Sequence, residues 1–181
     1  LAMLGFRTAV DLKDIYTEGI TGVAQEDVVN ARELGYRIKL LAIAKAAEGT
    51  LEARVHPTMI PAASPLAAVS GVFNAVFMTG DNVGDLMFYG RGAGQLPTAS
   101  AVWSDVLDIA RRVAHGLPAL AVDLPGNGAA ALPIRPMDAI RTAYKLLVLA
   151  LHRPGTLPQV AVHLGQHGIS IVSVLQKRRA E

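Results

Sequence analysis

The stretch that decides the fold is Tyr89-Gly90-Arg91-Gly92-Ala93-Gly94-Gln95-Leu96-Pro97-Thr98-Ala99-Ser100-Ala101-Val102-Trp103. It reads as the end of a strand, a glycine turn and the start of a helix. Alternating glycines allow positive φ angles and let a ligand come close to the backbone. The run from Pro97 to Ser100 predicts a helix N-terminus capped by Thr98 or Ser100. Free amides at the positive end of a helix dipole favour a phosphate or another anion, and a tight turn that packs the helix closely is the alternative.

The composition indicates a folded chain. Of the 181 residues, 51% are hydrophobic and 18% are charged, enough for a substantial core in one domain with part of another. The net charge of +2, the scattered basic residues and the 5% of aromatic residues argue against a nucleic-acid partner. The sequence has no cysteine, which excludes disulfides and thiolate sites and fits a reducing compartment. We therefore expect a cytoplasmic protein.

The apolar runs do not predict a membrane protein. The strongest, Leu146 to Leu151, is far shorter than the roughly 20 residues that cross a bilayer. The chain opens on Leu1 to Phe6, which has the pattern of a helix cut in the middle and no initiator methionine. We expect it to be part of a longer protein.

Hydrophobic periodicity predicts two hairpins and two helices in the first part of the chain. Because consecutive strands are joined by short turns, we expect an antiparallel meander whose last strand leads into the glycine turn. The predicted elements are a helix over 25–34 that ends at Gly35, strands over 37–46 and 51–60 around Glu48-Gly49, strands over 72–79 and 83–89 around Gly80-Asp81-Asn82, and a helix over 98–114.

The second part of the chain changes in composition. Glycine and proline from Gly116 to Pro136 predict a linker or a surface loop. The pattern then predicts a strand over 145–151, a helix over 157–166 ending at Gly168, and a strand over 169–175. A β-α-β unit of this length cannot close its own core, so we expect it to be truncated or completed by another chain.

Few side chains form a pattern that predicts catalysis or metal binding. His163 and His167 are four residues apart on the predicted helix, but no third ligand is in register, so we treat them as exposed helix residues and expect no metal. The isolated histidines His56, His115 and His152 are interpreted as hydrogen-bonded surface or core residues rather than general bases.

Other polar residues have plain structural interpretations beside the chemical ones. Lys39, flanked by apolar residues, is expected to reach out from a sheet edge rather than to serve as a buried amine. Asn74 lies inside a predicted strand and could be a hydrogen-bond anchor for the glycine turn. The acidic pairs are expected in a turn and on a solvated helix face respectively: Asp81 with Asp85, and Asp105 with Asp108.

Five ordered motifs within residues 1–115 resemble bacterial homoserine dehydrogenases. They are Glu18-Gly19-Ile20-Thr21-Gly22-Val23, Glu33-Leu34-Gly35-Tyr36-Arg37-Ile38-Lys39-Leu40-Leu41, Val55-His56-Pro57-Thr58-Met59-Ile60-Pro61, Gly71-Val72-Phe73-Asn74-Ala75-Val76 and the stretch from Met87 to Val102.

The resemblance continues beyond these motifs. Leu146 to Gln176 is similar to the opening β-α-β of an ACT regulatory domain, with Arg153-Pro154-Gly155-Thr156-Leu157 and His167-Gly168-Ile169-Ser170-Ile171 as its motifs. His152 stands where the aspartate before Arg-Pro-Gly is usual, which puts the effector contacts at that turn in doubt.

The resemblance implies an α+β fold, an antiparallel-rich mixed sheet with flanking helices followed by a partial βαβ ACT-like unit. The implied domains are 1–115, the C-terminal portion of the catalytic and dimerisation domain; 116–143, a linker; and 144–181, the N-terminal half of an ACT domain. In this family the Rossmann domain and the catalytic lysine lie upstream of Leu1, so no catalytic residue is assigned in this chain, and Lys39 is not promoted to that role. The implied cofactor contact is Gly94, with Gly92 and Thr98 as weaker neighbours.

The implied activity is the NAD- or NADP-dependent interconversion of L-homoserine and L-aspartate 4-semialdehyde, in threonine, methionine and isoleucine biosynthesis. The chain alone is expected to be inactive. L-threonine is the effector implied for the ACT-like part, and a homodimer or a higher homo-oligomer is expected. The alternatives are an amino-acid-binding regulatory module and a self-association scaffold.

Overall fold

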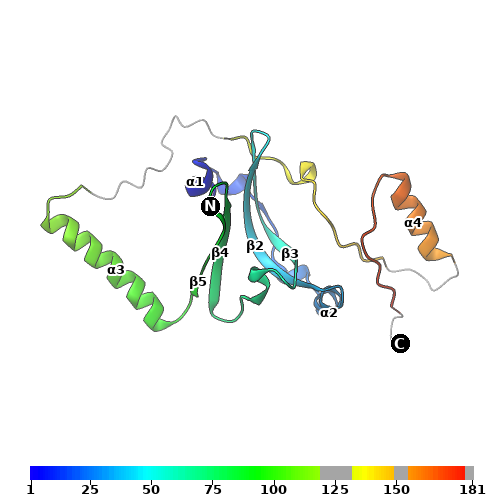
Figure 1. Ribbon diagram of the computed structural model, residues 1–181, viewed down its shortest axis with the longest axis horizontal. Coiled ribbons are helices and arrows are strands. Elements are labelled where there is room, and N and C mark those ends of the chain that lie inside the picture. Colours follow the sequence, from blue (N-terminus) through cyan, green and yellow to red (C-terminus); the bar gives the residue numbers. More distant parts are fainter. Residues whose placement is uncertain (119–131, 149–154, 178–181) are drawn as a thin grey trace. The chain divides into compact units, whose positions relative to one another are not determined.

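A computed structural model describes residues 1–118, 132–148 and 155–177. The chain divides into two compact units, Leu1–Asp138 and Ala139–Glu181. The first unit contains both sheets and helices α1 to α3, and the second contains α4 (Figure 1). Short 3-10 turns occur at Leu12–Asp14, Ile20–Gly22, Pro65–Ala68 and Met137–Ala139.

Helix α2 (Gln25–Glu33) lies where the sequence predicted a helix. The Asp27 carboxylate accepts a hydrogen bond of 3.0 Å from the Ala24 amide and so satisfies one of the free donors at the helix start. Gly35, with φ of +81°, follows the last turn. The shorter helix α1 (Ala2–Phe6) precedes it in the chain.

Strands β2 (Tyr36–Ala47) and β3 (Thr50–Pro61) form the predicted first hairpin. Ala47 pairs with Thr50, so the connection has two residues, Glu48 and Gly49. Both have positive φ, 53° and 71°, as the common two-residue turn between antiparallel strands requires. The turn prediction is therefore confirmed.

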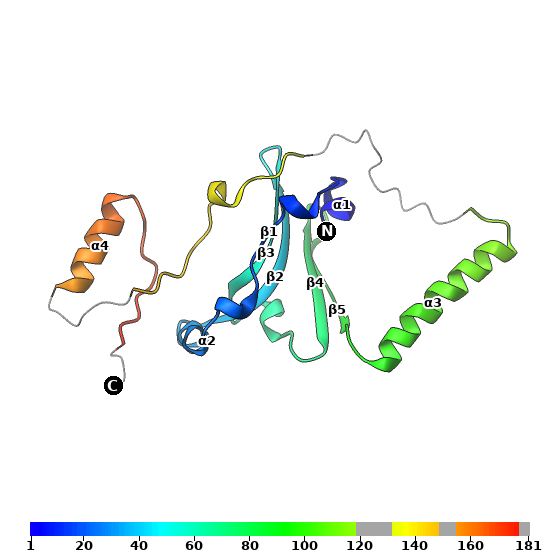
Figure 2. The same ribbon diagram turned by 180° about the vertical axis from the view of Figure 1, so that it is seen from behind.

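Strand β3 is the centre of a mixed three-stranded sheet. β2 lies antiparallel on one side, and β1 (Tyr16–Thr17) lies parallel on the other, as labelled in Figure 2. Further along the β1 side, Leu51 forms a parallel bridge with Ile134. The Leu51 amide donates to the Pro133 carbonyl at 2.9 Å, and the Arg135 amide donates to the Leu51 carbonyl at 2.8 Å. The end of the predicted linker therefore lies along β3.

The interior of this sheet contains charges as well as apolar groups. Leu51 and Ala31 are fully buried, and Ala53 is nearly so. Glu52 and Arg54 are also buried, with 9% and 5% of their surfaces exposed, although their alternation with Leu51 and Ala53 is typical of a solvated face. The face opposite the apolar residues is therefore covered as well.

The second hairpin, β4 (Phe73–Gly80) with β5 (Gly84–Arg91), confirms the other strand pair. It forms its own two-stranded sheet, so the expected single meander is wrong in the described residues. The reason is the connection: residues 62–72, which include the 3-10 turn at Pro65–Ala68, separate β3 from β4, and this is too long for a tight hairpin.

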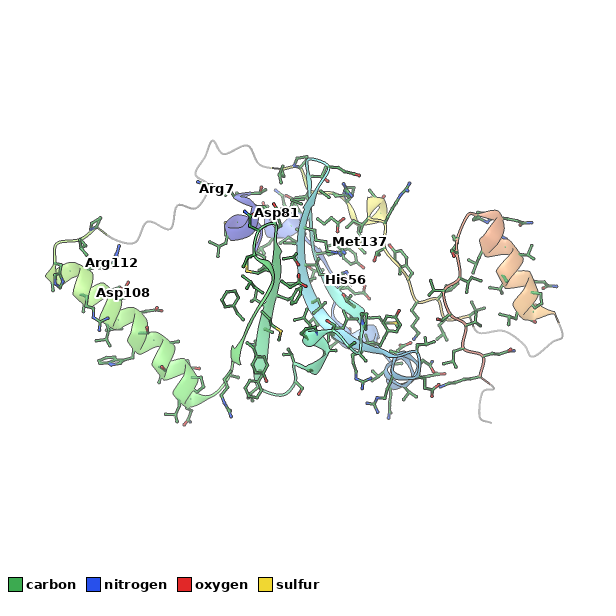
Figure 3. All side chains as sticks on the ribbon, viewed as in Figure 1. Arg7, His56, Asp81, Asp108, Arg112 and Met137 are labelled. Atoms are coloured by element: carbon green, nitrogen blue, oxygen red, sulfur yellow. The ribbon has the colours of Figure 1, made fainter. Side chains whose placement is uncertain are left out.

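Helix α3 (Gln95–Ala114) follows β5 as one continuous helix (Figure 1). None of its residues is buried, although four apolar side chains recur on one face. Those four are 45% to 74% exposed: Val102, Val106, Ile109 and Val113. Asp108 and Arg112 also project from this helix (Figure 3). Neither α3 nor any other helix within the described ranges has the length and apolarity needed to cross a membrane.

Helix α4 (Thr156–Gln166) confirms the predicted helix of the second unit, with Gly168 at a φ of +70° after it. The flanking strand predictions are not confirmed, because residues 145–148 and 169–175 have no strand pairing in the described structure. A strand needs a hydrogen-bonded neighbour, and neither segment has one there. The rest of the first predicted strand, and His152, lie outside the described residues.

Candidate functional site

The glycine turn joins β5 to α3 as the sequence predicted. Beyond Arg91, the Gly92 amide donates a hydrogen bond of 2.9 Å to the Val72 carbonyl, which fixes the turn to the chain just before β4. Gly94 follows with φ of 129° and ψ of 149°, and it is the N-cap residue of α3. Such a conformation is essentially confined to glycine.

Asn74 of β4 holds the first part of this turn by contact. A Cβ atom added to Gly92 would lie 1.6 Å from the Asn74 Nδ2 atom and 2.6 Å from its Cγ atom. The Asn74 side chain therefore occupies the space that any larger residue at position 92 would need. Asn74 was predicted as a hydrogen-bond anchor; the structure gives it a packing contact, while the hydrogen bond of Gly92 goes to Val72.

The predicted cap of the following helix is wrong. Helix α3 begins at Gln95, three residues before Thr98, and no side chain caps it. The Thr98 amide already donates to the Gly94 carbonyl at 3.1 Å, inside the first turn. Pro97 misled the prediction, because proline is tolerated anywhere in the first turn and not only at its first position.

The free donors within the first turn of α3 are the amides of Gln95 and Leu96. Within the described residues neither amide donates a hydrogen bond, and both residues are exposed. They stand at the positive end of a helix of 20 residues. An anionic group fits this position, because both donors and the helix dipole favour negative charge there.

Sequence reasoning named the neighbours of these donors rather than the donors themselves. The amides of Gly92 and Thr98 are used within the protein, so their place in the site is structural, and Gly94 sets the direction of the helix start. The signal that could have found Gln95 and Leu96 is Pro97: proline is tolerated throughout the first turn, so the helix could begin up to two residues before it.

Replacing Gly92 tests the contact with Asn74. We expect Gly92→Ala to destabilise the β4–β5 hairpin by about 1–2 kcal/mol, since the new methyl group overlaps the Asn74 amide. The loss should be largely relieved in the double variant Gly92→Ala/Asn74→Ala, where the amide is gone. Urea unfolding of the two single variants and the double variant measures this coupling. Additive effects of the two changes would contradict the contact.

The isolated histidines are bound within the protein. His56 lies on β3 (Figure 3). The Arg54 Nε atom donates to the His56 Nε2 atom at 3.1 Å, and His56 Nδ1 lies 2.9 Å from the Pro57 carbonyl oxygen. His115 Nδ1 lies 2.7 Å from the Arg111 carbonyl oxygen at the end of α3. Neither imidazole adjoins the glycine turn in sequence or through these bonds, which agrees with the structural interpretation.

His56 belongs to a group that we call the β3 charge cluster, namely Glu52, Arg54, His56 and Arg135. Arg54 Nη1 pairs with Glu52 Oε2, and Arg135 Nη1 lies 3.7 Å from Glu52 Oε1. Arg135 Nη2 also pairs with exposed Glu48 at 3.0 Å. The cluster joins residues far apart in sequence and was not predicted. Its pairs are satisfied internally, which indicates a structural role.

Lys39 and Asp85, two of the remaining candidates, also have structural partners. Lys39 lies on the edge strand β2 and donates to the Val69 carbonyl outside the sheet, so it has a structural partner. The Asp85 carboxylate accepts from the Thr79 hydroxyl at 2.7 Å across the β4–β5 hairpin. Asp11 accepts from the Lys13 amide, and this bond lowers the pKa of Asp11. In the described ranges no three histidine, aspartate or glutamate side chains gather as metal ligands do.

A comparison with protein families gives a match over the part of the chain that contains the glycine turn and the motifs before it. A family model described as homoserine dehydrogenase matches residues 1–107. The chain belongs to the homoserine dehydrogenase family. It is 46% identical to a homoserine dehydrogenase of Neisseria gonorrhoeae over 98% of its length, and 42% identical to one of Pseudomonas aeruginosa over its whole length.

Solved homoserine dehydrogenases share the fold. A crystal structure of the enzyme from Thiobacillus denitrificans matches 97% of this chain with 41% identity and a TM-score of 0.78. A Staphylococcus aureus homoserine dehydrogenase at pH 6.5 matches 68% of this chain with 41% identity and a TM-score of 0.56. The chain spans about 41% of the length of the Neisseria and Thiobacillus proteins. Its glycine turn lies inside the matched residues 1–107, and α4 lies outside them.

Proposed function

We propose that the protein to which this chain belongs interconverts L-homoserine and L-aspartate 4-semialdehyde with NAD or NADP. In the oxidising direction a hydride leaves the alcohol carbon for the nicotinamide ring, and the hydroxyl proton is released. Membership of the homoserine dehydrogenase family supports this activity. We place it in the cytoplasm, since the sequence has no cysteine for the disulfides typical of secreted proteins.

The observation that supports a cofactor role for this chain is the pair of unsatisfied amides at Gln95 and Leu96. They are exposed at the start of α3, immediately after Gly94. A dinucleotide carries phosphate groups, which helix N-termini of this kind favour. We propose that Gly94 gives the backbone its approach to the cofactor, and that Gly92 and Thr98 hold the turn in shape through their internal hydrogen bonds.

The bound cofactor would supply the hydride chemistry, and the residues of this chain would position it. The Gly92 bond to Val72 and the Asn74 contact keep the turn in place before any ligand arrives. The amides then need no rearrangement to meet a negative charge, which lowers the cost of binding. We propose that the groups that move the substrate proton lie in the part of the family's length that this chain does not span.

Two assays test this division of roles. The 181-residue chain is expected to give no oxidation of NADPH with L-aspartate 4-semialdehyde, whereas the longer protein that contains it is expected to turn over. The measurement is the loss of NADPH absorbance. Inactivity of the longer protein would contradict the proposed activity. Turnover by the chain alone would contradict only the proposal that the reactive groups lie elsewhere.

We further propose that the C-terminal residues 144–181 form half of an ACT domain that binds L-threonine. The support is the match of α4 to the predicted helix and its ending at Gly168. Self-association as a homodimer or a larger homo-oligomer is part of the same proposal. It is supported by the many exposed apolar side chains, such as Phe88 at 62% and Trp103 at 63%.

A further inference from the structure

The geometry points to a two-histidine binding site for a divalent transition-metal ion at the C-terminal end of α4. His163 and His167 are four residues apart, and their ring centroids lie 4.6 Å apart at an interplanar angle of 53°. A tetrahedral ion with bonds of about 2.1 Å holds two nitrogen ligands about 3.4 Å apart. Rings this close reach that separation by rotation about their side-chain bonds.

The backbone selects the tautomer of His167 that a metal needs. His167 Nδ1 lies 2.9 Å from the His163 carbonyl oxygen, so Nδ1 carries the proton and donates a hydrogen bond to that oxygen. The Nε2 atom is then left with its lone pair, as in the histidine ligands whose other nitrogen is hydrogen-bonded. The ring of His163 has no hydrogen bond within the described residues, so it is available without breaking one.

The surroundings favour a positive ion and leave room for its remaining ligands. No residue of α4 is charged, and the site lies at the negative end of the helix dipole. A hollow of about 340 Å³ lies beside His163, lined also by Pro158, Gln159, Val162 and Gln166. Because no third histidine or carboxylate is grouped there among the residues that the structure describes, water would complete the coordination.

The ligand type decides which ions fit. Two imidazoles without carboxylates suit zinc, nickel and copper, and they do not suit Mg²⁺ or Ca²⁺, which prefer oxygen ligands. Among the divalent ions of the first transition row, copper is expected to bind most tightly.

Calorimetric titration of the 181-residue chain with ZnCl₂ at neutral pH tests the site. We expect one saturable binding event with no counterpart for MgCl₂. His163→Ala and His167→Ala should each weaken zinc binding about tenfold or more, because a single imidazole remains. Unchanged affinity in either variant, or the absence of any zinc binding by the parent chain, would overturn the proposal.

Two further variants test whether zinc binding requires two imidazoles four residues apart or only a single histidine. His115 has the same Nδ1 contact with a backbone carbonyl at the end of α3 but has no second imidazole one turn away, so His115→Ala should bind zinc unchanged. Adding Gln159→His to His167→Ala rebuilds an i, i+4 pair one turn earlier and should restore binding. Loss of binding in His115→Ala, or no recovery in the rebuilt pair, would contradict the site.

Discussion

Glu52→Gln is expected to lower the free energy of unfolding of the first unit by about 3–5 kcal/mol. The change keeps the shape of the side chain and removes its charge. Glu52 is the acidic partner of Arg54 and also lies 3.7 Å from Arg135, and the side chains of Glu52 and Arg54 are only 12% and 6% exposed. Without the carboxylate, two guanidinium groups would face each other with little water to separate their charges.

Glu48→Gln is the matched control for this variant. It makes the same chemical change in a residue that also pairs with Arg135, at 3.0 Å, but its side chain is 84% exposed. An exposed ion pair contributes little, so a loss of about 0.5 kcal/mol or less is expected. Urea unfolding followed by far-UV circular dichroism compares the two. Equal losses of unfolding free energy in the two variants would show that burial of the β3 charge cluster does not increase its contribution to stability.

Gly94→Ala is expected to destabilise the first turn of α3 by about 1–3 kcal/mol, because alanine is strained at the φ of 129° and ψ of 149° found there. The new methyl group would also lie 3.3 Å from the Pro97 Cδ atom. Faster hydrogen exchange of the amides in 98–114 measures the effect. In the longer protein the same variant should raise the KM for the nicotinamide cofactor, since the free amides would no longer be held in place.

Gly90→Ala is the matched control for Gly94→Ala. It shows whether the expected effect comes from the backbone conformation of Gly94 or from the loss of any glycine in this region. Gly90 lies in β5 with an ordinary φ, and a Cβ atom there would meet nothing within 4 Å. Its replacement should change stability by about 0.5 kcal/mol or less and leave exchange in α3 unchanged. Similar acceleration of exchange in both variants would contradict the special role assigned to Gly94.

The elements that local sequence determines were predictable. Glu48-Gly49 specifies a two-residue turn, and the alternation on either side specifies the strands that it joins. Gly35 and Gly168 mark the ends of α2 and α4 because each takes a positive φ after the last turn. These features depend on neighbouring residues, and neighbouring residues are what a sequence pattern contains.

Features that depend on distant residues were not predictable. The pairing of Leu51 with Ile134 and of Glu52 with Arg135 brings together segments more than 80 residues apart, and no periodicity indicates it. The predicted strand over 169–175 failed for the related reason that a strand is defined by its partner.

The candidate site was predictable in place but not in detail. Alternating glycines located the turn, and the family resemblance indicated Gly94. Which amides stay free depends on the residue at which α3 begins, and the start of a helix is uncertain by a few residues when judged from sequence. Because α3 begins at Gln95, the free amides are those of Gln95 and Leu96 and not the amides near Thr98 that the sequence indicated.

The two-residue turn at Glu48 and Gly49 also determines which face of β3 carries the charged side chains. With two residues in the connection, Glu52 stands opposite Lys45 and Arg54 opposite Ile43. Insertion of one residue would shift every later position of β3 by one and exchange its two faces. Leu51 and Ala53 would then take the face on which Glu52 and Arg54 now lie, and the charged groups of Glu52 and Arg54 would point into the apolar interior. The length of this turn is therefore an electrostatic constraint as well as a geometric one.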